Sequence, residues 1–160
     1  MLSIKIISTG DFKEKYLKEA AEEYKKRISA WAKIEEIVLK EERLSDTPSP
    51  KEIETALETE QKHIFEKIPP KAYVIAMCIE GKQLSSTELA EKINEITVSG
   101  YSEIVLIIGS SFGLSNEVKK RANLCLSVSK LTFPHQLFKI MLMETLYRSL
   151  SIINGTKYHK

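Results

Sequence analysis

Three short segments that follow apolar runs are the places where this sequence could bind a ligand. They are residues 80–85, 109–115 and 129–135, and each contains Gly, Ser or other polar residues directly after a strand-like run. In open α/β sheets, ligands bind outside the carboxyl ends of the strands, where such loops meet. We therefore expect the three segments to line one crevice.

The run Gly109-Ser-Ser-Phe-Gly113 has the small residues of a phosphate-binding loop but not its spacing. It matches neither GxGxxG nor GxxxxGK[ST], which excludes both nucleotide-binding motifs. A tight turn, in which glycine adopts positive φ or allows a close approach, is the role that the residues alone favour. HExxH does not occur, and no Cys/His cluster has metal-ligand spacing; we expect no metal site and no catalytic triad.

Two of the three histidines lie where an imidazole could contact a substrate. His135 follows Pro134 at the start of an apolar stretch, where a packing role and a ligand contact compete evenly. His159 lies in the polar tail Lys157-Tyr158-His159-Lys160. Such a tail is either a disordered chain end or a flexible arm that closes over a substrate with an imidazole and a phenol.

The net charge of +2 hides an uneven distribution of charge along the chain. Residues 1–70 carry 13 Lys or Arg and 15 Asp or Glu, whereas from Lys119 onward eight basic residues stand against one acid, Glu144. A local excess of positive charge attracts phosphate, and a basic patch is the electrostatic footprint of a nucleic-acid partner. On its own this signal is weak, because scattered surface Lys and Arg also keep proteins soluble.

Length and composition favour one globular domain, which we expect to span residues 1–160. The chain is 42% hydrophobic and 29% charged, as in ordinary globular proteins. No apolar run reaches the roughly 18 residues of a membrane span, and residues 1–10 show no export signal. Cys78 and Cys125 lie in apolar runs without a CxxC partner, which indicates buried reduced thiols. We expect a cytoplasmic protein.

The apolar pattern predicts alternating strands and helices. Strands are expected at residues 3–8, 33–39, 73–79, 104–108 and 124–128, and helices at 13–28, 51–68, 86–98, 116–123 and 135–153. The last three strands are nearly continuous apolar runs, which are typical of parallel strands buried on both faces. The pattern therefore predicts a single α/β domain with a mostly parallel sheet flanked by helices.

The expected helix at 135–153 is apolar on more than one side. Its apolar residues are Leu137, Phe138, Ile140, Met141, Leu142, Met143, Leu146, Tyr147, Leu150, Ile152 and Ile153. A helix that is apolar nearly all round must be covered on most faces. One sheet face covers only part of such a helix, so we expect a second subunit to cover the rest in a homodimer.

Several motifs together resemble one known family. They are Gly109-Ser-Ser-Phe-Gly113, Ser127 to His135, Glu144-Thr-Leu-Tyr-Arg148, Tyr158-His159-Lys160, Lys13 to Tyr16 and Glu23 to Arg27. This set, which extends over nearly the whole chain, resembles the RlmH family of ribosomal RNA methyltransferases in the SPOUT superfamily. The resemblance implies a dimer of SPOUT-type α/β subunits in which about residues 100–160 form a trefoil knot.

The resemblance also implies an enzyme that uses S-adenosylmethionine. Its expected reaction is methylation of N3 of a pseudouridine, at position 1915 of 23S rRNA, in assembled 70S ribosomes. Carried over by motif, the cofactor site comprises Met77, Gly109, Val128, Ser129, Lys130, Leu131, Thr132 and Phe133. One departure is Ser110, which stands where the family usually has the second glycine of a Gly-Gly pair.

Arg148, Tyr158 and His159 are the residues expected around the acceptor base. Methylation at N3 requires alignment of the reacting atoms and removal or stabilisation of the N3 proton. His159 is the expected proton acceptor, because the pKa of free imidazole is about 6.5. Tyr158 is expected to orient or stack on the base. We expect the tail to act across the dimer interface, on the cofactor held by the other subunit.

Two other functions are compatible with the residues. A non-catalytic ribosome-binding assembly factor would use the same basic surface without affinity for S-adenosylmethionine. A small-molecule α/β enzyme would work independently of ribosomes and of salt.

Overall fold

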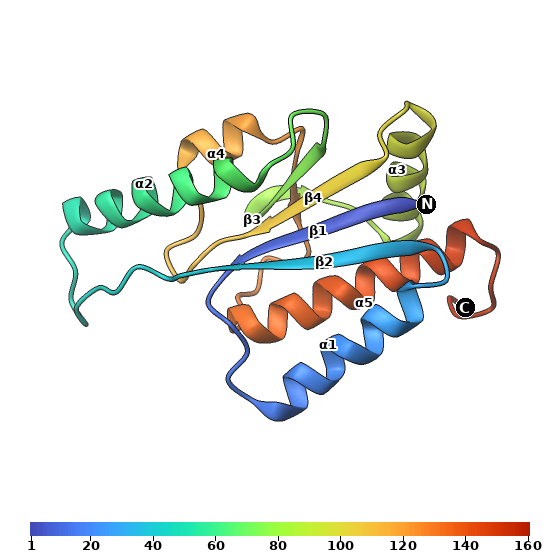
Figure 1. Ribbon diagram of the computed structural model, residues 1–160, viewed down its shortest axis with the longest axis horizontal. Coiled ribbons are helices and arrows are strands. Elements are labelled where there is room, and N and C mark those ends of the chain that lie inside the picture. Colours follow the sequence, from blue (N-terminus) through green and yellow to red (C-terminus); the bar gives the residue numbers. More distant parts are fainter.

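Five parallel strands form one sheet with helices on both of its faces (Figure 1). The structure is a computed structural model, and it describes all 160 residues. Its elements are β1 (Leu2–Thr9), α1 (Lys15–Ile28), β2 (Ala32–Leu39), α2 (Pro50–Lys67), β3 (Tyr73–Gln83), α3 (Ser86–Val98), β4 (Glu103–Ile108), α4 (Asn116–Arg121), β5 (Leu124–Ser127) and α5 (His135–Ile153). The predicted alternation of strands and helices and the parallel α/β sheet are confirmed.

The strands lie in the order β2-β1-β4-β3-β5. The central strand β4 pairs with β1 on one side and with β3 on the other, with Leu106 opposite both Ile6 and Ile75. All three of these residues are at most 1% exposed. A strand between two neighbours and under helices on both faces has no polar side, which explains the continuous apolar runs.

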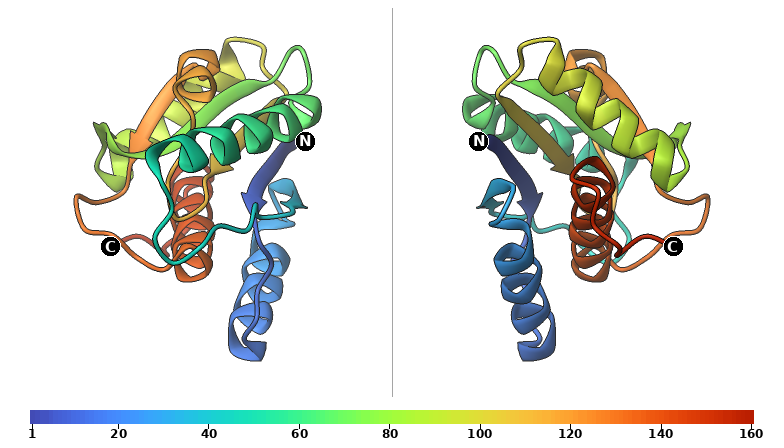
Figure 2. Two further views of the ribbon diagram at one scale, coloured as in Figure 1. Left: turned by 90° about the vertical axis from the view of Figure 1, so that its left-hand side faces the viewer. Right: turned by 90° about the vertical axis from the view of Figure 1, so that its right-hand side faces the viewer.

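The helices divide between the two faces of the sheet (Figure 2). Ile4, Ile6 and Leu106 belong to a core with α1, α3 and α5, whereas Ile7 and Val105 belong to a second core with α2 and α4. Successive side chains of a strand point to opposite faces, so each central strand contributes to both cores. The fold is therefore a three-layer sandwich in which all five carboxyl strand ends lie at one edge.

Strand β3 continues past the apolar run that predicted it. The expected end at residue 79 is wrong, because after an irregularity Lys82 and Gln83 pair with Leu126 and Ser127 of β5. Gly81 makes this possible, since a Cβ there would lie 2.7 Å from the Cys125 carbonyl oxygen. Backbone pairing with a neighbour extended the strand where side-chain polarity predicted a loop.

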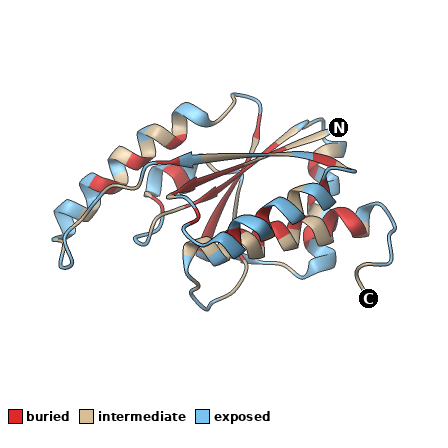
Figure 3. Cartoon of the chain, turned by 60° about the horizontal axis from the view of Figure 1, so that its bottom comes forward, coloured by how far each residue is buried: buried red, intermediate tan, exposed pale blue.

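Helix α5 is only partly covered by its own chain. Leu142, Met143, Leu146 and Leu150 are buried against α1, α3 and the sheet, and Figure 3 shows burial concentrated on the sheet and on the inward sides of the helices. Leu137 is 41% exposed. The uncovered part agrees with the expected second subunit, whereas the homodimer and the trefoil knot stay predictions. None of the helices is long and apolar enough to cross a membrane.

Candidate functional site

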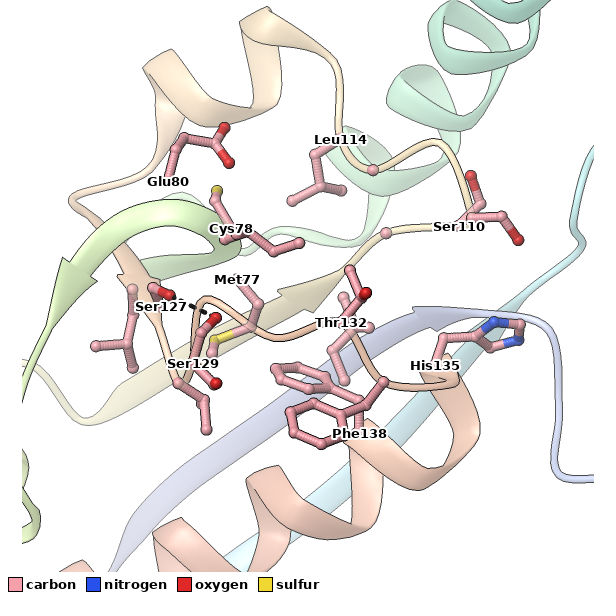
Figure 4. A pocket seen from close by; sticks show the side chains of 18 of the residues that line it. Met77, Cys78, Glu80, Ser110, Leu114, Ser127, Ser129, Thr132, His135 and Phe138 are labelled. Atoms are coloured by element: carbon pink, nitrogen blue, oxygen red, sulfur yellow. Dashed lines mark hydrogen bonds between the residues drawn. The ribbon is translucent and has the colours of Figure 1, made fainter.

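A cavity of about 580 Å³ opens at the carboxyl ends of β3, β4 and β5. Its walls come from residues 77–80 of β3, the loop 109–114, the loop that follows β5 and the start of α5 (Figure 4). The three segments predicted to form one crevice do meet here, because Glu80, residues 109–114 and most of 129–135 line the same space. The crevice prediction is confirmed, although only Glu80 represents its first segment.

The cavity combines an apolar floor with hydroxyl groups. Met77 and Leu126 supply buried apolar surface at the strand ends, and Phe138 adds an aromatic ring from α5. Ser127 and Thr132 bring hydroxyl groups to the same space. An apolar pocket with a few placed polar groups is the usual design of a small-molecule site.

The loop after β5 is held in shape by hydrogen bonds of its own. The Ser127 hydroxyl donates to the Ser129 carbonyl at 3.1 Å, and the backbone N–H of Leu131 donates to the Ser129 hydroxyl at 3.0 Å. Both bonds link residues two positions apart, so they close short turns. The segment that lines the cavity is therefore preorganised without a ligand.

Gly109 and Gly113 form a tight turn at the opposite wall. Gly113 has φ +82°, and its N–H donates to the Ser110 carbonyl at 2.9 Å. A Cβ on Gly109 would collide with the Gly113 carbonyl oxygen. The turn explains both glycines, as the residues alone predicted, and the loop also lines the cavity.

Ser110 fits this turn without backbone strain, since no residue other than glycine has positive φ. Its hydroxyl is buried and has no hydrogen-bond partner. The buried carboxyl of Glu60 on α2 lies beside it, and burial raises the pKa of Glu60 to about 7. The next residue of α2, Gln61, accepts a hydrogen bond from Ser115 at 2.7 Å. Helix α2 thus supports the loop at both ends.

An ion pair and a buried thiol complete the lining of the cavity. Glu80 and Lys119 pair at 2.5 Å on its rim, and this contact lowers the pKa of Glu80. Cys78 is free and buried, and burial raises the pKa of its thiol to about 12, so it is a wall residue and no nucleophile. The long sequence separation between the glutamate and the lysine left no local signal for their pairing.

Seven of the eight residues expected to bind the cofactor line this cavity: Met77, Gly109, Val128, Ser129, Leu131, Thr132 and Phe133. Lys130 does not line it. Its side chain is exposed, and it forms no ion pair. The cofactor-binding role of Lys130 stays a prediction, which its exposed side chain does not support from inside the cavity.

The three residues expected around the acceptor base also meet, but elsewhere. Arg148 on α5 lies 3.2 Å from Nδ1 of His159, and its guanidinium carbon lies 4.7 Å from the ring centroid of Tyr158. Glu144, one turn before Arg148, accepts hydrogen bonds from Arg148 at 2.6 Å and from the Tyr158 hydroxyl at 3.0 Å. We call these four residues the tail cluster.

Aromatic rings surround the tail cluster. Tyr147 lies with its ring centroid 4.6 Å from that of Tyr158 and 5.8 Å from that of Trp31. Burial and the Glu144 carboxylate raise the pKa of Tyr158, and they raise the pKa of Tyr24 to about 12. Both tyrosines are therefore neutral phenols at physiological pH.

The cavity lies at the start of α5, where His135 and Phe138 line it, whereas Glu144 and Arg148 of the tail cluster lie in the second half of this helix, whose course Figure 1 shows. His135 at the first residue of α5 lines the cavity, whereas Arg148 lies 13 residues further along. At a rise of about 1.5 Å per residue, this is a separation of about 20 Å along the helix axis. Within one chain, the two groups of residues cannot act on the same atoms.

No group of three or more His, Cys, Asp or Glu side chains is placed to hold a metal ion. The tail cluster offers neutral and cationic hydrogen-bond donors, and the cavity offers hydroxyl and backbone groups, all of which can bind and orient organic ligands.

Comparisons with known proteins agree on one family. A family model described as "Predicted SPOUT methyltransferase" matches residues 2–159. The chain is 54% identical to the ribosomal RNA large subunit methyltransferase H of Caldicellulosiruptor bescii, over 98% of this chain and 99% of that protein. It is 46% identical to the protein of the same name from Streptococcus suis, over 99% of this chain and 100% of that protein.

The fold is also similar to a solved structure described as that of a probable methylase family protein from Haemophilus influenzae Rd KW20. The TM-score is 0.53 at 14% identity, and the match covers 99% of this chain and 70% of that one. At this identity the likeness concerns the fold alone. From the family match and the close relatives together, the chain belongs to the SPOUT methyltransferase family and, within it, to the ribosomal RNA large subunit methyltransferase H group.

Proposed function

We propose that this protein is an S-adenosylmethionine-dependent methyltransferase that methylates N3 of a pseudouridine, at position 1915 of 23S rRNA, in assembled 70S ribosomes. The observation that carries the proposal is the cavity at the strand ends, which seven motif residues line in a chain 54% identical to a named rRNA methyltransferase. We place the activity in the cytoplasm, where assembled ribosomes are, and assign it to residues 1–160 as one domain.

The cavity suits S-adenosylmethionine in size and in chemistry. Its volume of about 580 Å³ lies within the roughly 300–1,000 Å³ of small-molecule sites. Met77, Leu131 and Phe133 would cover the faces of the adenine ring, and backbone groups of residues 128–133 would bond its edge. Gly109 leaves room beside the turn that a Cβ would fill.

When bound, S-adenosylmethionine would supply an electrophilic methyl group to N3 of the base, with its sulfur keeping the electron pair of the broken S–CH₃ bond and the N3 proton passing to water. Arg148, Tyr158 and His159 would surround the acceptor base and orient it. Tyr158 would pack on the base as a neutral phenol, because burial and its hydrogen bond to Glu144 raise its pKa. Aromatic and guanidinium planes are the usual partners of an unstacked RNA base.

The two parts of the site would be joined by a second subunit. They lie about 20 Å apart along α5 in one chain, and Leu137, beside the cavity, is left exposed on the same helix. In a homodimer that covers this face, the tail cluster of one subunit would meet the cavity of the other. The knot at about residues 100–160 would fix α5 against the cavity loops.

Mixed dimers test this arrangement. One subunit would carry Gly109→Ala in the cavity, and the other would carry Arg148→Ala in the tail cluster. If the tail acts across the interface, the heterodimer retains one intact composite site and is more active than either homodimer. A heterodimer as inactive as both parents would show that each tail serves its own cavity.

The basic surplus late in the chain is partly neutralised within the protein. Four of its eight residues have acidic partners: Lys119 with Glu80, Lys120 with Glu117, Lys139 with Glu36, and Arg148 with Glu144. Arg121, Lys130, Lys157 and Lys160 form no ion pair and remain available for rRNA phosphates. A small number of free cations fits recognition of one shaped ribosomal site better than general coating of RNA.

The deciding experiment is methyl transfer from labelled S-adenosylmethionine to 70S ribosomes, with calorimetry of cofactor binding to the protein alone. The proposal predicts label at N3 of one pseudouridine and saturable cofactor binding. Ribosome binding without cofactor affinity would instead support the non-catalytic assembly factor. Methyl transfer that does not depend on ribosomes would support a small-molecule enzyme.

A further inference from the structure

Glu144 contacts two other members of the tail cluster, Arg148 and Tyr158, although it lies neither in the cavity nor in the tail itself. Its carboxylate accepts two hydrogen bonds from Arg148, at 2.6 and 3.1 Å, and lies 3.0 and 3.1 Å from the Tyr158 hydroxyl. Its side chain is only 24% exposed. Charge-assisted bonds at a half-buried position are among the stronger polar contacts in proteins. Glu144 thus ties the chain end to α5.

Arg148 transmits this anchoring to His159. With Nε and one terminal nitrogen bound to Glu144, its other terminal nitrogen lies 3.2 Å from Nδ1 of His159. A guanidinium has five N–H donors and no acceptor. Nδ1 of His159 must therefore be the acceptor of this bond, and in the neutral imidazole the proton is then on Nε2. Arg148 selects one of the two tautomers.

We propose that Glu144 is a positioning residue that, through Arg148, holds His159 with its proton on Nε2, so that His159 meets the acceptor base as a hydrogen-bond donor. The inference rests on the proposed methyltransferase function and deepens it. It assigns His159 the opposite role from the proton acceptor that the sequence predicted, because neither ring nitrogen has a free lone pair in this arrangement.

A donor at this position has a clear chemical use. When N3 of the base loses its proton to water, negative charge develops on the two flanking carbonyl oxygens. A preorganised N–H aimed at such an oxygen stabilises the charge and is worth about 10²–10³ in rate. The positive charge of Arg148 behind the ring makes the Nε2–H group a stronger donor.

Three substitutions of His159 separate a donor from a base. His159→Gln places an amide N–H close to the position of Nε2, whereas His159→Asn places one close to Nδ1, and neither amide accepts a proton at neutral pH. We expect His159→Gln to keep kcat within about 10-fold of the wild type, and His159→Asn and His159→Ala to lose about 100-fold or more. A glutamine variant as inactive as the alanine variant would overturn the donor role.

Glu144→Gln tests the anchoring. The amide cannot hold Arg148 by charge, so we expect kcat to fall about 10- to 100-fold while cofactor affinity in the distant cavity stays unchanged. The matched control is Glu95→Gln, which removes an exposed ion pair to Lys92 on α3. A Glu144→Gln enzyme with the kcat of the control would contradict the positioning role.

Nitrogen-15 NMR of the imidazole rings gives a readout that needs no substrate. In the wild type, His159 should show a proton on Nε2 and a bare Nδ1, with its signals assigned by their loss in His159→Gln. In Glu144→Gln, we expect a mixture of the two tautomers. A wild-type His159 protonated on Nδ1 would disprove the donor role of Nε2, even if methyl transfer is observed. Conversely, an enzyme without methyl transfer would refute the proposed function and leave this reading intact.

Discussion

The two ends of α5 are built on different physical principles. The cavity depends on backbone geometry, with strand ends, a glycine turn and buried apolar walls such as Met77 and Leu126. The tail cluster depends on charge and hydrogen bonds between half-exposed side chains around Glu144. A site of the first kind is rigid and tolerates changes of salt, whereas one of the second kind is adjustable and sensitive to salt. The comparison teaches that cofactor binding and base positioning should be separable by mutation.

Gly109→Ala should have the largest effect, because it breaks the rigid end. The new Cβ would collide with the Gly113 carbonyl oxygen. Because this is a backbone atom, the turn itself would have to change shape to relieve the collision. We expect cofactor binding by calorimetry to be lost and methyl transfer to fall at least about 100-fold. The matched control is Gly100→Ala at φ +96°, where a Cβ meets nothing within 4 Å. It should cost about 1 kcal/mol of stability and leave cofactor affinity unchanged. Equal losses in both variants would contradict the special role of the turn.

Arg148→Ala should damage the adjustable end alone. Glu144, Tyr158 and His159 would lose their common partner, so we expect kcat to fall about 10- to 100-fold. Cofactor affinity should remain that of the wild type, because the cavity lies at the other end of α5. Arg148→Lys serves as the control, since it keeps the charge without the forked geometry and should recover only part of the rate. A large loss of cofactor affinity in Arg148→Ala would show that the two ends are coupled.

Glu60 is the buried carboxyl beside the cavity loop, and we expect it to make the stability of the rigid end depend on pH. Its pKa is about 7 in the folded chain against an ordinary value of 4.5. The folded state therefore keeps a proton that the unfolded chain has lost, and stability falls as pH rises from about 4.5 to about 7.

We expect Glu60→Gln to be more stable than the wild type at pH 8 by about 1–3 kcal/mol, and nearly equal to it at pH 5. Urea unfolding at both pH values measures this difference. The exposed Glu58→Gln on the same helix should show no such dependence on pH. A Glu60→Gln advantage that is the same at both pH values would refute the burial argument.

Lys130→Ala should have the smallest effect, and it tests whether the Lys130 side chain contributes to cofactor affinity. Because Lys130 is exposed and does not line the cavity, cofactor affinity should not change. Ribosome binding should weaken several-fold, and the slope of log affinity against log salt should fall by about one. Lys71→Ala, which removes an exposed lysine in the turn before β3, should leave the slope unchanged. A loss of cofactor affinity in Lys130→Ala would show that this side chain does bind the cofactor.

Much of the fold could be predicted from local patterns. The apolar runs around Val74, Leu106 and Leu126 indicated buried parallel strands, and each forms one. The loops after these strands were expected to share a crevice, because parallel strands end at one edge. Such features depend on the chemistry and the spacing of neighbouring residues, which are visible in the chain itself.

Pairing between distant segments decided the rest. The sheet places β5 beside β3. Backbone pairing with β5 then extends β3 past Gly81 to Gln83. The burial of Glu60 beside Ser110 and the distance between Lys130 and the cavity had no local signal either. Motifs along the chain indicated which residues could bind a cofactor and which could meet a base. The separation of these two sets along α5 depends on the packed fold, because the length and direction of a packed helix separate residues that a motif places in one group.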